Sequence, residues 1–308
     1  MKILVILAAF NGEKYIKEQI DSILAQKNVS LDIFIFDDVS SDNTINVIKI
    51  YNNDDRIKLI INPIATKSAA NNFFNAIKEI PNKTLASYNY ISLSDQDDIW
   101  LPYKLKIATD CLLNQKASLY CSNLILWDEM GKSESIINRS HPQKKYDYLF
   151  ESGSAGCTYV FTSAFCLELK KSIKTINYLQ WKFFSHDWFI YFFARVNDYK
   201  VIVDNKANIK YRMHANNLHG FLNKKNFSAS IERLKIIQSG WYDEHIKGFN
   251  QLVKQNSIES YIYLMYTKNY FTRIFIVAKY NFSLNRSFKK SIQFFIISAL
   301  PLFKNTNK

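Results

Sequence analysis

The chain has 308 residues, of which 48% are hydrophobic and 15% aromatic, and its formal net charge is +13 at pH 7. This length and apolar content provide a sizeable core for one large domain, or for one domain with an extension, and exclude a disordered chain. The four cysteines, at positions 111, 121, 157 and 166, form no CxxC pair, which argues against a zinc site or a disulfide framework and favours a reducing cytoplasm.

Apolar runs alternate with segments of helical period in the first part of the chain. The opening stretch MKILVILAAFNGEKY has too short an apolar part for a secretory signal, and we expect it to begin with a strand. The predicted strands cover residues 2–10, 31–38, 56–63, 88–95 and 118–128, and the predicted helices cover 13–26, 41–53, 69–80 and 101–115. Alternation of this kind predicts an α/β fold with a mostly parallel sheet covered by helices on both faces.

The rest of the chain is less regular. Residues 151–219 contain the stretches SGSAGCTYVF, FFSHDWFIYFFARV and YRMHANNLHG, and the pattern after Gly220 is largely helical. We therefore expect a first domain over residues 1–220 and a helical C-terminal extension over residues 221–308. Neither GxxxxGK nor GxGxxG occurs, so P-loop and dinucleotide fingerprints are absent from the sequence.

Polar and acidic side chains follow three of the predicted strands. In parallel sheets, ligands bind beyond the carboxyl ends of the strands, so these side chains are expected at one edge of the sheet. The set consists of Asn11 and Glu13 after the first strand, Asp37 and Asp38 at the end of the second, and Asp95, Asp97 and Asp98 after the fourth.

The stretch ISLSDQDDIWLP concentrates carboxylates that repel each other unless a cation neutralises them. Hard divalent ions such as Mn²⁺ or Mg²⁺ prefer oxygen ligands, and Mg²⁺ takes only one or two protein carboxylates beside water and phosphate oxygens. Asp95 and Asp97 point the same way in an extended link, since they are two residues apart. A helix cap or a solvated turn would explain a single aspartate, but the group of three favours a site for a metal and a diphosphate.

The motifs AAFNGEKYIKEQIDSILAQ, FDDVSSDNT and SDQDDIW, in this order, resemble family 2 glycosyltransferases of the GT-A fold. The full SDQDDIW, with the later HDW and YRMHANN, is similar to the rhamnosyltransferase-like branch of that family. The resemblance covers about residues 1–220 and implies that this part is a nucleotide-sugar-binding and catalytic domain. Each motif alone is weak, whereas their order and spacing are specific.

The resemblance implies a role for the ends of the first two strands in nucleotide binding. Ala8, Phe10 and Asp38 would hold the base and ribose, with Ala8 acting through its backbone because many relatives have Thr there. Glu13 would line the same pocket, and Asp95 would contact the ribose or act through metal-bound water. Asn11 is a further candidate in this region.

The same resemblance implies the metal and diphosphate contacts. Asp97 is the expected direct metal ligand, and Asp98 would either join the site or orient its loop. Arg212 and His214 of YRMHANN would approach phosphate and metal. Gly156 in AGCTYVF would allow close approach of the donor sugar, because glycine has no side chain.

SHDWF lies where the family carries its catalytic base, and this maps to Asp187, with His186 and Trp188 as further candidates. An acceptor hydroxyl must lose a proton as it attacks the anomeric carbon, and a carboxylate can accept that proton. The alternative is that Asp187 only caps the helix that begins there. His186 replaces the Glu that the wider family has before this Asp.

The positive net charge and the last segment of the chain suggest contact with a membrane surface. RSFKKSIQFFIISALPLFKNTNK has an apolar centre that is too short to span a bilayer of about 30 Å, and Lys289, Lys290 and Lys304 flank it. This segment is predicted either to lie on a membrane surface or to pack as a terminal helix on the domain. A cytoplasmic protein, peripheral on the inner face of the cell membrane, fits the first alternative.

These features together predict an inverting, metal-dependent glycosyltransferase. Its donor would be a nucleotide-diphospho-sugar, with dTDP-rhamnose or a UDP-hexose as family-level expectations, and its acceptor a glycan or lipid-linked glycan of bacterial surface polysaccharide. A phosphatase of the haloacid dehalogenase type lacks support because no acid follows Asp37 or Asp38 at the required spacing. A nucleic-acid-binding protein lacks a recognisable motif. A catalytically inactive, sugar-nucleotide-binding relative is the alternative. The presence of Asp38, Asp97 and Asp187 in one chain argues against it.

Overall fold

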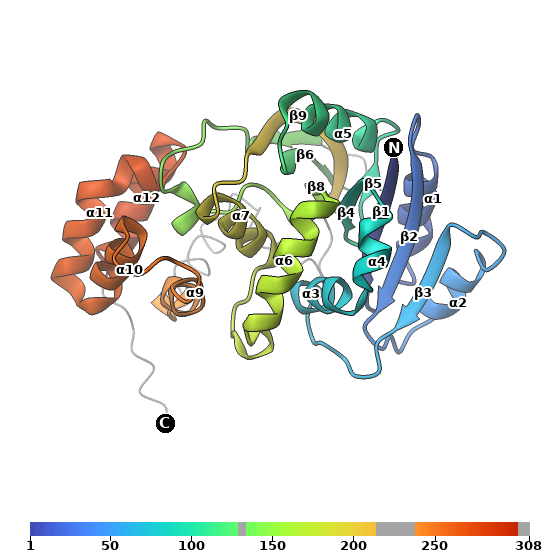
Figure 1. Cartoon of the computed structure of the whole chain (residues 1–308), viewed down its shortest axis with the longest axis horizontal. Helices are drawn as coiled ribbons and strands as arrows, with labels where there is room; N and C mark the ends of the chain where they lie inside the picture. Colours follow the sequence, from blue (N-terminus) through green and yellow to red (C-terminus); the bar gives the residue numbers. More distant parts are fainter. Residues whose placement is uncertain (129–133, 214–237, 301–308) are drawn as a thin grey trace. The chain divides into compact units, whose positions relative to one another are not determined.

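The computed structural model describes residues 1–128, 134–213 and 238–300 (Figure 1). The chain divides into two units that interleave along the sequence. Unit 1 comprises Met1–Ser140, Gly153–Gln180 and Phe184–Arg212, and unit 2 comprises His141–Ser152, Trp181–Phe183 and Met213–Lys308. Unit 2 is therefore assembled from three stretches, and the functional division near residue 220 stays a prediction.

Unit 1 is built on one nine-stranded sheet within the described ranges, in the order β3-β2-β1-β4-β8-β6-β9-β5, with β7 beside β6 (Figure 1). One half is parallel and consists of β3 (Ile57–Ile61), β2 (Ser30–Asp37), β1 (Lys2–Ala9) and β4 (Tyr90–Ser94). The α/β class is confirmed, and the four parallel strands are those expected from the alternating pattern.

The second half of the sheet is antiparallel where its pairing is described. It contains β5 (Ile99–Trp100), β6 (Leu119–Asp128), β7 (Glu134–Ile137), β8 (Val160–Thr162) and β9 (Val201–Met213). The strand expected at residues 118–128 does not continue the parallel series, because β8 lies between β4 and β6 and runs antiparallel to both. The sheet is thus mixed, and its parallel part is limited to the first four strands in the order.

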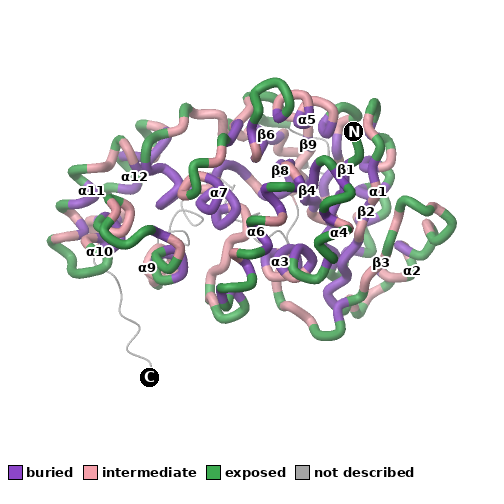
Figure 2. Tube along the Cα trace, viewed as in Figure 1, coloured by how far each residue is buried: buried purple, intermediate pink, exposed green. Residues whose placement is uncertain are grey.

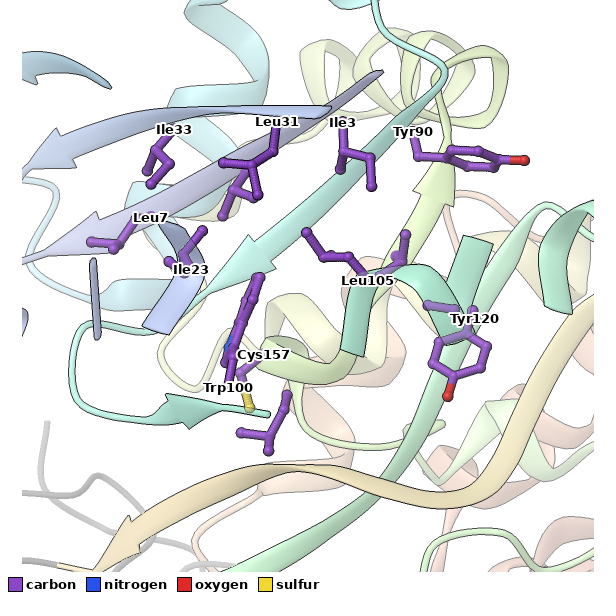
Figure 3. Close-up of a cluster of buried hydrophobic side chains, with 14 of the residues drawn as sticks. Ile3, Leu7, Ile23, Leu31, Ile33, Tyr90, Trp100, Leu105, Tyr120 and Cys157 are labelled. Atoms are coloured by element: carbon purple, nitrogen blue, oxygen red, sulfur yellow. The ribbon is translucent and has the colours of Figure 1, made fainter. Parts of the chain in front are cut away.

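Helices of unit 1 cover the sheet, so β1, which lies between β2 and β4, is buried on both faces. Ile3, Leu4, Val5, Ile6 and Leu7 of β1 all have 0% exposure, which a strand with one solvated face would not show. Part of the core is drawn in Figure 3. The helices are α1 (Ile16–Leu24), α2 (Thr44–Lys49), α3 (Ala69–Glu79), α4 (Asn82–Ala86), α5 (Lys104–Gln115), α6 (Ser163–Thr175) and α7 (His186–Val196).

Unit 2 packs its helices around aromatic side chains. Phe150 lies with its ring centroid 4.9 Å from Tyr266, 4.9 Å from Phe294 and 5.7 Å from Tyr242. Such tilted and edge-on ring pairs stabilise the fold by more than the burial of their apolar surface alone would. The helices are α9 (Trp241–Phe249), α10 (Ile258–Lys268), α11 (Tyr270–Leu284) and α12 (Phe288–Ser298). Among the described helices, none has the length and apolar character needed to cross a membrane.

A buried ion cluster joins the first stretch of unit 2 to its last. Arg286 Nε lies 3.7 Å from Asp147 Oδ2 and 3.5 Å from Glu151 Oε2, and Lys290 Nζ lies 2.6 Å from Glu151 Oε2. Arg286, Asp147 and Glu151 are all buried. Burial by itself raises the pKa of Glu151, but Lys290 and Arg286 outweigh burial and leave this pKa below its usual value.

We expect Arg286→Met to destabilise unit 2 by about 3 kcal/mol near neutral pH, because it leaves buried carboxylates without their cation. The lowered pKa of Glu151 means that the ion cluster stabilises the fold above about pH 4.5 and that this contribution is lost as the pH falls through the folded-state pKa. The difference in unfolding free energy between wild type and variant should therefore decrease on acidification. Denaturant unfolding at several pH values measures it, and Lys289→Met, an exposed neighbour, is the control with little expected effect. An equal loss at pH 3.5 and pH 7 would contradict this account.

Candidate active site

The loop after β4 is fastened to the loop after β1. Phe10 N donates to Gln96 Oε1 at 2.8 Å, and Gln96 Nε2 donates to Phe10 O at 2.9 Å. Gly12 makes room for this amide, since a Cβ at Gly12 would lie 2.3 Å from Gln96 Oε1. Gln19 Nε2 also donates to Ser94 Oγ at 3.1 Å. The carboxyl ends of two neighbouring parallel strands are thus held together, as expected for a ligand site at this edge.

Asp38, a predicted nucleotide contact, is 3% exposed and organises the loop after β3. Its carboxylate accepts hydrogen bonds from Asn62 Nδ2 at 2.9 Å, Thr66 N at 2.6 Å and Lys67 N at 3.0 Å. Ala8, in the adjacent β1, is buried as well. Asp38 therefore folds residues 62–67 against the end of β2, and its contact with a nucleotide stays a prediction.

Asn11 and Glu13 link the loop after β1 to the loop after β2. Asn11 Oδ1 accepts from Ser41 N at 2.8 Å, and Glu13 Oε2 accepts from Asn43 N at 2.8 Å. Phe10 at the end of β1 is 52% exposed, so its ring offers an apolar surface at the same edge. Phe10, Asn11 and Glu13 therefore lie at the same edge of the sheet as Asp38, and Asp95, the other expected nucleotide contact, follows β4.

The carboxylates after β4 surround a thiol. Asp95, Asp98 and Cys157 each bring one potential ligand atom within 4.8 Å of the others. Burial raises the pKa of Asp95 to about 7, with repulsion from Asp97 and Asp187 adding to the shift. Burial also raises the pKa of Asp98 well above its usual value, with Asp97 and Asp95 adding. The Cys157 thiol hydrogen-bonds to both carboxylates, and burial raises its own pKa, so it remains a protonated donor.

The chemistry of this group fits a hard divalent cation. Repelling carboxylates provide the oxygen ligands that Mg²⁺ and Mn²⁺ prefer, whereas a protonated thiol is a poor ligand for them. Asp97, the expected direct ligand, is partly exposed and close enough for its charge to raise the pKa values of both neighbours. It lies outside the tight group formed by Asp95 and Asp98 with Cys157.

A buried lysine lies next to these carboxylates. Lys104 is 2% exposed, and its Nζ donates to Ser92 Oγ at 2.9 Å and lies 3.4 Å from the centre of the Trp100 ring. Burial lowers the pKa of Lys104 to about 7, while the negative charge of the nearby Asp98 opposes the shift. When protonated, Lys104 offsets part of the negative charge from within the protein.

Asp187 lies in the first turn of α7, near the loop after β4. Ser185 is the N-cap, and its side chain accepts from Trp188 N; Asp187 Oδ1 accepts from the same N–H at 2.8 Å. Tyr159 Oη donates to Asp187 O at 3.0 Å. The charge of Asp187 contributes to the raised pKa of Asp95. Asp187 thus helps to cap the helix and also lies near the site, so the geometry accommodates both interpretations of this residue.

Gly156 and His186 pack against each other. A Cβ at Gly156 would lie 2.0 Å from His186 Nε2, so the space above this glycine holds an imidazole. The His186 ring centroid is 4.6 Å from that of Phe73. In this structure Gly156 accommodates the histidine beside the candidate base, and its expected contact with a donor sugar stays a prediction.

Arg212 anchors the loop that carries the carboxylates. Its Nε donates to Asp97 O at 2.8 Å, and its guanidinium forms an ion pair with Glu18. The guanidinium carbon also lies 4.6 Å from the centre of the Tyr15 ring and 4.5 Å from the centre of the Trp127 ring. These contacts fix the position of the loop, and the predicted contact with phosphate stays untested.

Sequence reasoning missed several residues of the site, including Cys157. His214, which was predicted, lies outside the described residues. Gln96 stands between two aspartates in SDQDDIW, which was a usable signal. Lys104 gave none, because a lysine in an amphipathic helix ordinarily faces water. Glu18 and Tyr211 contact the site only through the tertiary structure; burial and then Asp98 and Asp95 raise the pKa of Tyr211.

Residues 4–171 match the family model described as Glycosyl transferase family 2. The chain is similar to dTDP-rhamnosyl transferase RfbG of Shigella flexneri, with 37% identity over 242 residues, 78% of this chain and 82% of that protein. It is also similar to UDP-Glc:alpha-D-GlcNAc-diphosphoundecaprenol beta-1,3-glucosyltransferase WfgD of Escherichia coli, with 33% identity over 159 residues, 51% of this chain and 58% of that one.

Solved structures share the fold. TarS 1-349 of S. aureus in complex with UDP superposes with a TM-score of 0.56 at 17% identity, over 97% of this chain and 89% of that chain. The mannosyltransferase PcManGT from Pyrobaculum calidifontis, in complex with GDP-Man and Mn²⁺, gives a TM-score of 0.56 at 12% identity, over 96% of this chain and 84% of that chain.

We expect Gly156→Ala to destabilise the protein by about 1–3 kcal/mol, because the added methyl group overlaps the His186 ring. In a His186→Ala background the same substitution should cost less than about 0.5 kcal/mol, since the obstacle is gone. Denaturant unfolding of the four proteins gives the coupling between the two sites. Equal costs in both backgrounds would show that the glycine is needed for another reason.

We also expect Lys104→Met to change how stability depends on pH. The folded-state pKa of Lys104, about 7, lies below the usual 10.5, so the unfolded chain binds the extra proton between these values and wild-type stability rises with pH across that window. Met fills similar space without a charge. The unfolding free energy of wild type minus variant should increase by a few kcal/mol from pH 7 to 10.5, at about 1.4 kcal/mol per pKa unit. Lys106→Met, on the same helix, is the control; a difference that does not vary with pH would refute the assignment.

Proposed function

The chain belongs to glycosyl transferase family 2, and from this premise we propose that it transfers a sugar from a nucleotide-diphospho-sugar to a glycan acceptor with inversion at the anomeric carbon. The observation that carries the proposal is that Asp187, from α7, lies close enough to the loop after β4 for its charge to raise the pKa of Asp95. A candidate base and the expected diphosphate site thus share one edge of the sheet although they come from distant parts of the sequence.

The donor is expected at the ends of β1, β2 and β4. TarS, which has the same fold, has been solved in complex with UDP, and this supports a nucleotide as part of the donor. The exposed ring of Phe10 offers a stacking surface for a base, and Asn11, Glu13 and Asp38 fix the surrounding loops. Similarity to a dTDP-rhamnosyl transferase favours dTDP-rhamnose, with a UDP-hexose next.

The reaction is one displacement. The acceptor oxygen forms a bond to the anomeric carbon as the bond from that carbon to the diphosphate oxygen breaks, and the electron pair leaves with the nucleoside diphosphate. Asp187 takes the proton of the acceptor hydroxyl. Because attack and departure occur on opposite faces of the sugar, the configuration inverts. Ser185 and the N–H of Trp188 hold the Asp187 carboxylate in place for this step.

A divalent ion, Mn²⁺ or Mg²⁺, completes the proposal. Asp97 is the expected direct ligand, with Asp95 and Asp98 beside it, and the complex of PcManGT with GDP-Man and Mn²⁺ supports an ion in this fold. When bound, the ion would offset the charge that develops on the leaving diphosphate. Without an ion, burial raises the pKa values of Asp95 and Asp98, and repulsion between the neighbouring carboxylates adds to the shift.

The setting that we propose is synthesis of bacterial surface polysaccharide in the cytoplasm, at the inner face of the cell membrane. The name of WfgD specifies a diphosphoundecaprenol-linked acceptor, and this similarity supports a lipid-linked glycan here. The net charge of +13 is compatible with a location beside anionic lipids.

The test is donor turnover by Asp187→Asn. We expect release of nucleoside diphosphate from dTDP-rhamnose or UDP-glucose in Mn²⁺ to fall by about 10²–10⁴-fold, the usual contribution of a general base. Donor binding, followed by calorimetry, should stay within a few-fold of wild type because Asn retains the shape of Asp. Asp55→Asn, exposed and distant in sequence, is the matched control.

EDTA should abolish wild-type turnover and Mn²⁺ should restore it. Unchanged turnover in Asp187→Asn would rule out Asp187 as the base. Full turnover in EDTA would rule out a requirement for a divalent metal. Tight binding of donor with no turnover by wild type under any condition would favour the inactive, sugar-nucleotide-binding alternative.

A further inference from the structure

Two helices of unit 2 expose large apolar side chains. On α11, Phe271 is 80% exposed, Phe275 54% and Phe282 66%; on α12, Phe288 is 70% exposed, Ile292 46% and Ile296 54%. Figure 2 shows exposed and buried positions alternating along both helices. Soluble proteins rarely expose contiguous apolar surface of this kind unless it binds something. We call these six side chains the apolar face.

The six residues belong to one surface. Those of α11 follow at spacings of four and seven, and those of α12 at spacings of four and four, so each set lies on one side of its helix. The Phe282 and Phe288 rings stack with centroids 6.3 Å apart, and Tyr270 Oη donates to Ala299 O at 2.8 Å. The start of one helix therefore lies beside the end of the other, and the two sets adjoin.

The part of the chain that forms the apolar face carries charge of one sign. No Asp or Glu occurs after Glu259, whereas this part of the chain contains six Lys and two Arg. Arg273 and Arg286 are buried and pair with acids elsewhere in unit 2. Lys268, Lys279 and Lys289 are exposed, and Lys279 Nζ lies 5.9 Å from the centre of the Phe275 ring.

We propose that the apolar face binds the surface of a bilayer that contains anionic lipid. Aromatic and aliphatic side chains on one side of a helix, flanked by lysines, are suited to the boundary between headgroups and acyl chains. The lysines add attraction to anionic headgroups. The inference does not depend on sugar transfer.

Charge complementarity favours lipid over a second copy of the chain. In a two-fold dimer through this face, Lys279 and Lys289 of each copy would meet lysines and no carboxylate, which is unfavourable. A nucleic acid would match the positive charge but leave the phenylalanines uncovered. An anionic bilayer matches both the charge and the apolar surface.

The apolar face differs from the membrane segment expected from the sequence. That expectation placed the contact in the terminal segment through Lys289, Lys290 and Lys304. Lys290 is instead engaged by the buried Glu151, and Lys304 lies outside the described residues. The structure adds α11, whose exposed phenylalanines are separated in the sequence by residues that pack inward.

Vesicle flotation tests the proposal with the full-length chain. We expect it to float with vesicles of phosphatidylcholine and phosphatidylglycerol at about 0.1 M salt, and much less with phosphatidylcholine alone or in 0.5 M salt, where screening weakens attraction. The triple variant Phe282→Ser, Phe288→Ser, Ile292→Ser should bind at least 10-fold more weakly. Lys279→Gln with Lys289→Gln should bind several-fold more weakly to anionic vesicles.

The control is Ile50→Ser with Leu113→Ser, which removes two side chains of unit 1 that are 66% and 60% exposed. It should float like wild type. Thermal melting and donor hydrolysis in solution should be unchanged in all variants, which separates a failure of this proposal from a failure of the proposed reaction. Absence of wild-type flotation, or flotation that ignores the substitutions, overturns the proposal. Loss of a sedimenting dimer in the triple variant, without any vesicle binding, would assign the face to self-association instead.

Discussion

Repulsion between like charges at the end of β4 is the constraint on which the arrangement of unit 1 depends. Three aspartates follow a fully buried strand within four residues, and burial raises the pKa of two of them. Groups from three elements compensate the negative charge. β9 supplies the N–H of Arg212, the turn before β8 supplies the Cys157 thiol, and α5 supplies Lys104. In the proposed reaction, an ion and a diphosphate would complete the compensation.

The first half of the fold could be predicted from the sequence because its signals are local. Each parallel strand is a continuous apolar run, and each following helix repeats its apolar residues at helical spacing, as Ile16, Ile20 and Ile23 do. The second half depends on pairings between distant segments. β5 has two residues and exists only because β9 lies beside it, more than a hundred residues later, and no local pattern indicates such a partner.

The candidate site shows the same division. The aspartates after β4 and Asp187 could be found from the sequence. Acidic residues at the end of an apolar strand or at the start of an apolar helix interrupt the apolar pattern there. The contacts of Asp38 and Gly156 could not, because they involve residues 24 or more positions away, such as Asn62 and His186. Sequence reasoning identified which residues carry unusual chemistry but not which neighbours hold them.

The interleaved construction of unit 2 has a consequence for synthesis on the ribosome. Glu151 receives its hydrogen bond from Arg286, 135 residues later. At about 5–20 residues per second, that stretch takes on the order of ten seconds to translate. During this interval the acids near residue 150 and the Phe150 ring leave the exit tunnel without the helices that will cover them. Until α11 and α12 emerge, the nascent chain therefore exposes apolar and charged surface of the kind that chaperones bind.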